Sequence, residues 1–225
     1  MERRFVAAAL TLAVAACAAA GALPFGPPMP PSGSQQPHPA IEALRGYSAT
    51  IHTTLGDMEV AFEPDEAPNA VRNFIKLALK GFYDGSPFYA VFRDKMILAG
   101  DPTGKGTGDA GHTLDFEGTF LGAEAGALMM DTVPQEAKDR LAGKKNSGSR
   151  FFIAVTDQAH LDGDYTTFAR ITWGLDVAER VSRARAIDRD GAPAPVEDLV
   201  IERITIATRD KEAEEAAREA EDETD

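Results

Sequence analysis

The segment from Tyr83 to Gly108 says most about the architecture, and it reads YDGSPFYAVFRDKMILAGDPTGKGTG. Its first half holds an apolar run, Ala90–Leu98, which predicts strand structure. Its second half, Asp101–Gly108, is glycine-rich like a phosphate loop but lacks the order G-x-x-x-x-G-K-[ST]. It is followed by Asp109 and further glycine, with no helical pattern. We therefore predict a loop that needs glycine at positive φ rather than a phosphate loop.

Short apolar runs and two helical patterns surround this segment. Ser48–Thr54 and Met58–Phe62 predict two strands around a turn. A proline in the first turn and an apolar 3.6-residue period predict a helix from Ala67 to Gly81, and a second helix is expected over Asp176–Ala184. Further strand-like runs are Ala127–Met130, Phe151–Val155, Thr167–Ile171 and Leu199–Ile206. Many short strands with two helices favour a mainly β closed barrel, which also leaves few exposed sheet edges.

Composition excludes several classes of protein. The 225 residues carry 23 basic and 36 acidic side chains, a formal net charge of −13, which disfavours nucleic-acid binding because phosphate neutralisation requires Lys and Arg. A single cysteine excludes an internal disulfide. The four histidines, at 38, 52, 112 and 160, lack metal-ligand spacing, so neither a metal nor a cofactor is predicted.

The N-terminus resembles a bacterial lipoprotein signal. A basic start, Met1–Arg4, is followed by twelve uncharged residues, Phe5–Ala16, a length typical of a signal-peptide core. Val14-Ala15-Ala16-Cys17 then resembles a lipobox, in which the cysteine is lipidated and becomes the mature N-terminus. We predict a signal peptide over 1–16 and a lipid anchor at Cys17, which would place the protein in the bacterial cell envelope. An uncleaved anchor and ordinary cleavage to a soluble protein are the alternatives.

Two further segments flank the predicted domain. Residues 17–45 read as the lipidated N-terminus and a tether, because seven of the fourteen prolines lie between Pro24 and Pro39 and such chains are extended spacers. The PxxP-like spacing within it is also compatible with a partner ligand. Residues 209–225 form an acidic tail, and residues 46–208 remain as one domain.

Four ordered blocks within 46–208 resemble the cyclophilins, the peptidyl-prolyl cis-trans isomerases. They are Ala67–Phe74, the pair Tyr83–Phe88 and Met96–Gly104 in ungapped register, Asn146–Ile153, and Leu161–Phe168. The resemblance implies a mainly β fold, an eight-stranded antiparallel barrel closed by a helix at each end. It also implies isomerisation of X–Pro bonds without a cofactor, acting on proline-containing peptides or unfolded envelope proteins.

The polar positions of that family's active site are largely replaced here. The register places Ala90 at the family's donor arginine, Leu98 at its orienting glutamine, and Lys95 at an aromatic residue of the proline pocket. Losing one preorganised donor costs a factor of about 10² to 10³ in rate. We therefore expect weak isomerase activity, with a non-catalytic peptide-binding or chaperone-like module as the alternative.

The rest of the implied groove is mixed. Its apolar wall is retained at Met96, Phe152 and Leu161, whereas His160 replaces a tryptophan and Tyr165 replaces a histidine. Arg150, in place of a groove glutamine, is the candidate catalytic residue, since a side chain of its length can reach toward the space left at Ala90. A segment longer than the family pattern, Val133–Lys145, is expected to form a short helix beside the groove.

Overall fold

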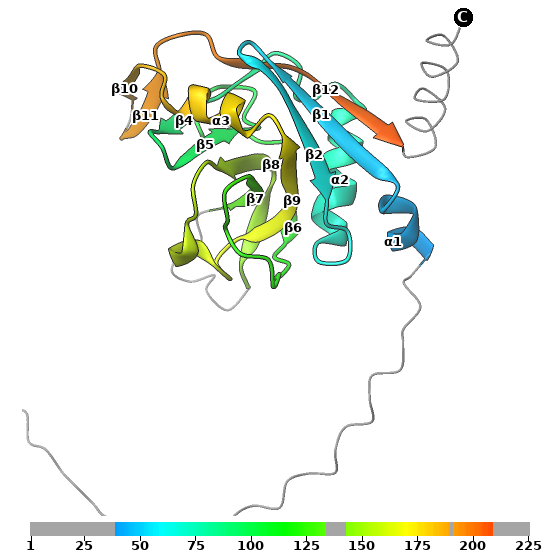
Figure 1. The fold of residues 1–225 in the computed structure, drawn as a ribbon. Coiled ribbons are helices and arrows are strands. Elements are labelled where there is room, and N and C mark those ends of the chain that lie inside the picture. Colours follow the sequence, from blue (N-terminus) through cyan, green and yellow to red (C-terminus); the bar gives the residue numbers. More distant parts are fainter. Residues whose placement is uncertain (1–38, 134–142, 190, 209–225) are drawn as a thin grey trace, which may run out of the picture. The chain divides into compact units, whose positions relative to one another are not determined.

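One strongly curled antiparallel sheet dominates the computed structural model, which describes residues 39–133, 143–189 and 191–208 (Figure 1). Nine strands follow the order β3-β12-β1-β2-β9-β7-β8-β5-β4, and β6 pairs with β8. The strands are β1 (Tyr47–Thr53), β2 (Gly56–Phe62), β3 (Ser86–Pro87), β4 (Ala90–Phe92), β5 (Met96–Ala99), β6 (Thr113–Asp115), β7 (Ala127–Thr132), β8 (Lys145–Ala154), β9 (Thr166–Trp173) and β12 (Val200–Thr208).

The sheet returns to its own starting point. Its two terminal strands, β3 and β4, are separated only by Phe88 and Tyr89. The Phe88 amide donates to the Leu199 carbonyl and the Tyr89 amide donates to the Leu98 carbonyl, so this short link is tied to both edges. The mainly β, curled antiparallel fold expected from the sequence is thereby confirmed, although β3 and β4 do not pair with each other.

The strand count differs from the eight expected. The apolar run Ala90–Leu98 is two strands, because Arg93–Lys95 form a turn in which Asp94 has a φ of 56°. The two-residue β3 and the three-residue β6 are also separate strands. A hairpin outside the main sheet, β10 (Ala186–Arg189) with β11 (Ala192–Pro195), forms a second small sheet.

Two longer helices pack against the barrel, as the sequence predicted. They are α2 (Pro68–Ala78) and α3 (Leu175–Ser182), and a single 3₁₀ turn, η2 (Ala159–Leu161), lies beside β8. The start of α2 is capped from a distance: Ala67 has no capping side chain, and the Glu117 carboxylate accepts hydrogen bonds from the amides of Asn69 and Ala70. On its inner face Phe74 is fully buried and stacks on Tyr83 at 5.0 Å.

The end of the predicted tether is not an extended spacer. Residues Pro39–Leu44 form a short helix, α1, whose Leu44 is 8% exposed. The Arg45 guanidinium donates to both carboxylate oxygens of Asp65, at 2.6 and 3.0 Å. Burial of one leucine and this paired contact hold residues 39–45 against the domain. The earlier part of the tether, Cys17, the signal peptide and the acidic tail lie outside the described residues.

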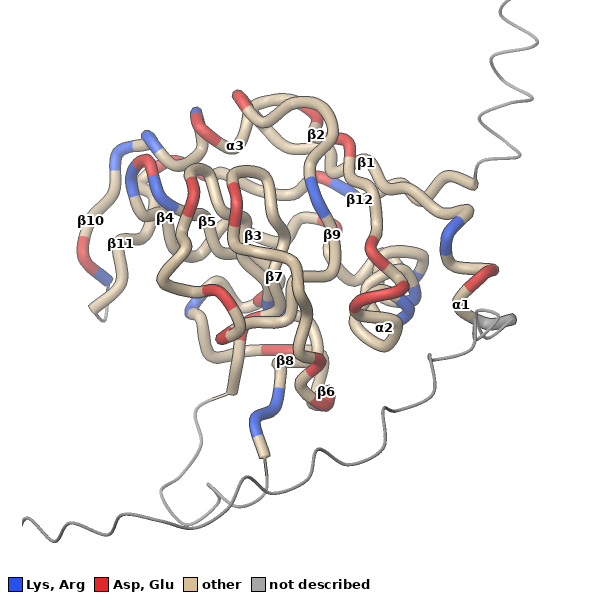
Figure 2. Tube along the Cα trace, turned by 60° about the horizontal axis from the view of Figure 1, so that its bottom comes forward, with Lys and Arg blue, Asp and Glu red and all other residues tan. Residues whose placement is uncertain are grey.

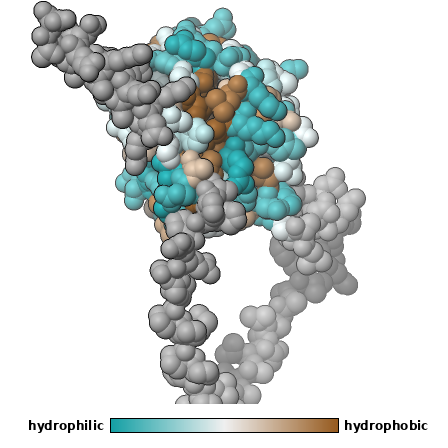
Figure 3. Space-filling view, turned by 90° about the vertical axis from the view of Figure 1, so that its right-hand side faces the viewer, coloured by the Kyte–Doolittle hydropathy of each residue, from teal (hydrophilic) through white to brown (hydrophobic). Residues whose placement is uncertain are grey.

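The barrel side formed by β12 and α2 carries an apolar band bordered by hydrophilic residues (Figure 3). Leu79, directly after α2, is 67% exposed, and Ile206 of β12 packs on the main core.

In the described part of the chain, no helix has the length and hydropathy needed to cross a membrane. The helix expected within Val133–Lys145 falls mostly on residues 134–142, which also lie outside the described residues.

Candidate functional site

An apolar cluster lies on the outer surface of the barrel, separate from the main core. Strand alternation creates it: Phe151 of β8 faces the interior with Met130, whereas Phe152 faces outward with Met129 of β7. Phe152 is also the register partner of Leu98 in β5. The partly buried members of the cluster are Met96, Leu98, Leu161 and Tyr165. The result is an apolar floor built from three strands and the η2 turn.

This floor brings together five of the residues predicted from the sequence: Met96, Leu98, Phe152, Leu161 and Tyr165. The Phe152 and Tyr165 rings meet edge to face at 4.8 Å, which fixes both orientations. The two rings therefore form a fixed apolar surface in which Phe152 is buried and Tyr165 is partly buried.

Three predicted residues lie outside the cluster. Ala90 is the register partner of Leu98, but it is only 1% exposed, and β11 packs against the strand that carries it. Ala90 is therefore buried on a strand that the hairpin contacts. Lys95 and His160 are exposed, and the Lys95 side chain borders a different pocket, beside Phe92.

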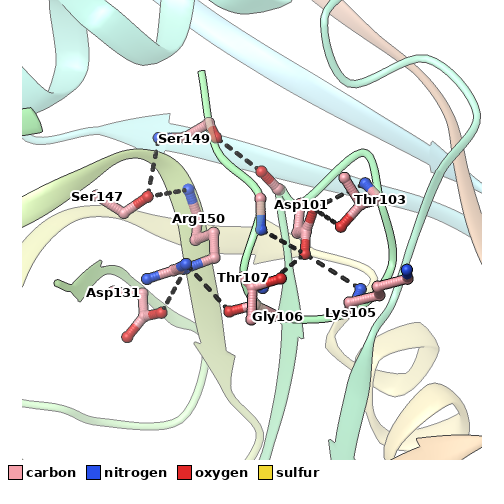
Figure 4. Close-up of polar contacts among 11 residues, drawn as sticks. Asp101, Thr103, Lys105, Gly106, Thr107, Asp131, Ser147, Ser149 and Arg150 are labelled. Carbon is pink, nitrogen blue, oxygen red and sulfur yellow. Dashed lines mark hydrogen bonds and ion pairs between the residues drawn. The ribbon is translucent and has the colours of Figure 1, made fainter. Parts of the chain in front are cut away.

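Arg150 is tied to the base of the groove (Figure 4). Its Nε donates to Asp131 Oδ2 at 2.8 Å and its Nη1 donates to the Gly106 carbonyl at 3.0 Å. The side chain is 7% exposed and that of Asp131 is 24% exposed, so the ion pair is largely shielded from water. These bonds direct the guanidinium toward β7 and the Asp101–Gly108 loop, whereas the sequence analysis directed it toward Ala90.

Asp131 also affects two tyrosines. Burial, and after it the charge of Asp131, raises the pKa of Tyr89. The pKa of Tyr165 is raised by the same two causes in the same order. Both phenols therefore stay protonated at neutral pH and remain hydrogen-bond donors. Sequence reasoning missed Tyr89 and Asp131, although an acid directly after the apolar run Ala127–Met130 was a visible signal.

The Asp101–Gly108 loop forms one wall of this polar end. Asp101 is fully buried and its carboxylate accepts hydrogen bonds from the backbone amides of Thr103, Lys105, Thr107 and Gly108 and from the Thr103 hydroxyl, at 2.7 to 3.1 Å. Burial alone would raise the pKa of Asp101, but the bonds from Thr103 and Gly108 outweigh it and lower that pKa. Gly104 and Gly106 have φ values of 68° and 76°, which confirms the predicted loop.

A cavity of about 240 Å³ opens between this loop, the groove and the hairpin. It is lined by Tyr89, Leu98, Gly104, Lys105, Gly106, Asp131, Arg189 and Ala192. The cavity connects the apolar floor at Leu98 with the polar pair at Asp131. Across the described ranges, no group of three or more His, Cys, Asp or Glu side chains is arranged to hold a metal ion.

Residues 48–206 match the family model for cyclophilin type peptidyl-prolyl cis-trans isomerases. Together with the curled antiparallel sheet and the outer apolar cluster, this match shows that the chain belongs to the cyclophilin family.

The chain is also similar in sequence to individual members of this family. It is 37% identical over 166 residues to peptidyl-prolyl cis-trans isomerase 9 of Schizosaccharomyces pombe, covering 72% of this chain and 26% of that protein. It is 32% identical over 163 residues to peptidyl-prolyl cis-trans isomerase CYP18-1 of Arabidopsis thaliana, covering 71% of this chain and 95% of that one. The chain thus spans about a quarter of the first relative and nearly all of the second.

A solved structure shares the fold. The crystal structure of a cyclophilin type peptidyl-prolyl cis-trans isomerase from Cryptosporidium parvum matches with a TM-score of 0.62 and 26% identity, covering 72% of this chain and 97% of that one. The same protein was also solved in the presence of the dipeptide Ala-Pro, with the same TM-score and 25% identity.

Proposed function

We propose that this protein is a peptidyl-prolyl cis-trans isomerase of low activity that acts on X–Pro bonds of cell-envelope proteins. The observation that carries the proposal is the apolar floor of Met96, Phe152 and Leu161 on a cyclophilin barrel. A proline ring packed on the Phe152 face would leave its preceding amide directed toward the polar end of the groove.

The chemistry required is small, because isomerisation forms no covalent intermediate. Rotation about an X–Pro bond breaks amide resonance and meets a barrier of about 20 kcal/mol. A protein lowers this barrier by binding the twisted amide better than the planar one, with an apolar pocket for the ring and a donor placed for the twisted state.

The donors available in this groove are limited. Ala90 and Leu98 have no polar side chain to offer. Arg150 already donates to Asp131 and Gly106, and Tyr89 lines the same cavity as Leu98 with its hydroxyl buried beside it. We assign the residual donor role to these two side chains, which explains why the proposed activity is low.

The test is the cis-to-trans relaxation of an X–Pro test peptide by the purified full chain. We expect a measurable acceleration that falls in Arg150→Ala and in Tyr89→Phe, the second of which removes a single oxygen. An unchanged relaxation rate with the unmodified protein would contradict the enzyme proposal. Equal rates for all three proteins would instead remove these two residues from the catalytic role.

A second candidate function is a non-catalytic peptide-binding module. The observation in its favour is that Ala90, at the proposed donor position, is both apolar and buried, while the apolar floor remains intact. This candidate predicts that a proline peptide shifts the amide NMR signals of Met96, Phe152 and Leu161 without accelerating its isomerisation. The absence of shifts at millimolar peptide would exclude it.

We further infer that Cys17 is lipidated and anchors the protein in a bacterial envelope membrane. The inference rests on the basic start, the uncharged core and the Val14–Cys17 lipobox of the sequence. Expression in a bacterial host with a labelled fatty acid should label the unmodified chain, and Cys17→Ser should abolish the label. Labelling of the variant, or its absence in both proteins, would contradict the anchor.

A further inference from the structure

A pocket of about 410 Å³ lies between the β4–β5 turn, the segment after α3 and the β10–β11 hairpin. Its apolar lining includes Val91, Phe92 and Pro193, and Phe92 is 37% exposed. Arg93, Lys95 and Arg185 also line it, and no acidic side chain does. The pocket is separate from the Phe152 groove, with which it shares no lining residue.

The pocket exists because two sheets meet here without joining. β4 is the terminal strand of the large sheet and pairs only with β5. The neighbouring strand β11 carries Pro193 and Pro195, and proline has no N–H to donate to an adjacent strand. β11 therefore packs against β4 without extending its sheet, and an edge of β4 borders the pocket.

The local charge is opposite to that of the whole chain. Three acids on the elements around it are already engaged. Asp94 and Glu179 both pair with the Arg183 guanidinium, at 2.5 and 3.3 Å. Asp188, the register partner of Pro193, accepts a hydrogen bond from the Gly191 amide. Arg93 has a 3.8 Å contact with Asp94 and donates to the Arg183 carbonyl at 3.5 Å, and within the described part of the chain Lys95 and Arg185 have no ion-pair partner. Figure 2 shows basic segments gathering beside β4 and β10, on a protein of net charge −13.

We propose that this pocket binds an extended acidic segment of another polypeptide. One apolar side chain of the segment packs on Phe92 and Pro193, and flanking carboxylates face Arg93, Lys95 and Arg185. A polypeptide fits better than a nucleotide or a lipid headgroup, because the edge of β4 offers backbone groups that another extended chain can match. The acidic remainder of the surface repels such a segment elsewhere, so charge directs it to this site.

The test uses two proline-free fluorescent peptides, so that its outcome is independent of isomerase activity. One has the sequence Asp-Glu-Phe-Glu-Asp and the other Asn-Gln-Phe-Gln-Asn, and binding to the full chain is followed by fluorescence anisotropy. We expect the acidic peptide to bind at least tenfold more tightly and to weaken as salt is raised, because the exposed charges are screened. Backbone NMR signals of Val91, Phe92 and Ala186 should shift.

Matched variants locate the site. Arg93→Gln combined with Arg185→Gln should weaken the acidic peptide at least tenfold, whereas Lys76→Gln combined with Lys80→Gln on α2 and its C-terminal turn removes the same charge and should change nothing. Equal affinity for the two peptides, or equal losses in both double variants, would overturn the proposal.

A chain ending at Thr208 should bind as the full chain does. A large gain in affinity on this truncation would overturn the external partner in favour of the protein's own acidic tail.

Discussion

Two carboxylates near the groove, Asp101 and Asp131, are stabilised in opposite ways. Asp101 receives all its hydrogen bonds from within the eight residues Asp101–Gly108, four of them from backbone amides. Asp131 of β7 depends on Arg150 of β8, nineteen positions away. The first arrangement is a local property of a glycine-rich loop, whereas the second exists only after two strands have paired. Because the contacts of Asp101 are local, the Asp101–Gly108 loop can form whatever residues occupy the positions of Asp131 and Arg150.

The largest expected effect is at the start of the local loop. Gly100 has a φ of 87°, and an added Cβ would lie 2.2 Å from the Ser149 carbonyl oxygen, so Gly100→Ala should destabilise the protein by about 4 kcal/mol. Gly85→Ala is the control, because its φ is 71° but no atom lies within 4 Å of the added Cβ, and it should cost about 1 kcal/mol. Denaturant unfolding measures both, and equal costs would contradict the close contact.

The next largest loss of stability is expected from removing the buried negative charge of Asp101. Asp101→Asn turns an NH₂ group toward backbone amides that need an acceptor, and it should cost about 3 kcal/mol at neutral pH. Asp109→Asn is the control, since within the described residues its partly exposed carboxylate accepts a single hydrogen bond, from the Gly111 amide, and it should change stability by less than about 0.5 kcal/mol.

The same carboxylate predicts an acid response. Its pKa is lowered in the folded state, so its stabilising contribution is present above its ordinary pKa and is lost as pH falls through the lower folded value. The free energy of unfolding should therefore decline more steeply below about pH 4 in the unmodified protein than in Asp101→Asn. Parallel curves for the two proteins would show that the loop does not hold the charge as described.

The Arg150–Asp131 ion pair should contribute less to the free energy of unfolding than the Asp101 carboxylate does. Arg150→Ala leaves Asp131 partly buried without its partner, at a cost of about 2 kcal/mol, and adding Asp131→Asn should recover part of that loss. Arg180→Ala, which breaks an exposed pair with Asp176, should cost less than about 1 kcal/mol. A double-mutant cycle with no coupling would contradict a cooperative pair.

The smallest effect concerns the apolar floor and is read from peptide isomerisation. Phe152→Ala removes the ring that meets Tyr165, and it should lower kcat/KM at least tenfold, a change of about 1.4 kcal/mol in transition-state binding. Phe120→Ala removes a fully exposed ring and should leave the rate unchanged. A similar rate for both variants would place the proline elsewhere.

The sequence predicted some of these features well and others poorly. The first two strands, α2, α3 and the Asp101–Gly108 loop were readable because proline position, apolar period and glycine content act over short distances. The split of Ala90–Leu98 into two strands was missed, since the turn depends on Asp94 adopting a φ of 56°. The helix α1 was missed because the burial of Leu44 depends on a surface formed by distant parts of the chain.

The residues of the candidate site also separate into those that the sequence predicted and those that it did not. The apolar members Met96, Phe152 and Leu161 were predicted from motif resemblance, and alternation along β5 and β8 suffices to turn them outward. The role of Asp131, the engagement of Arg150 and the burial of Tyr89 were not predictable from spacing, because each requires contacts between elements that are separated in the chain.

By itself, the sequence determined that this protein has a mainly β fold of the cyclophilin type, because the motifs and the local apolar periodicity are properties of the residues themselves. Only the tertiary structure decided that Ala90 is buried, that Arg150 is held by Asp131, and that a basic pocket forms beside β4. Those outcomes depend on which strands become neighbours, and neighbour relations are set by the packing of the whole domain.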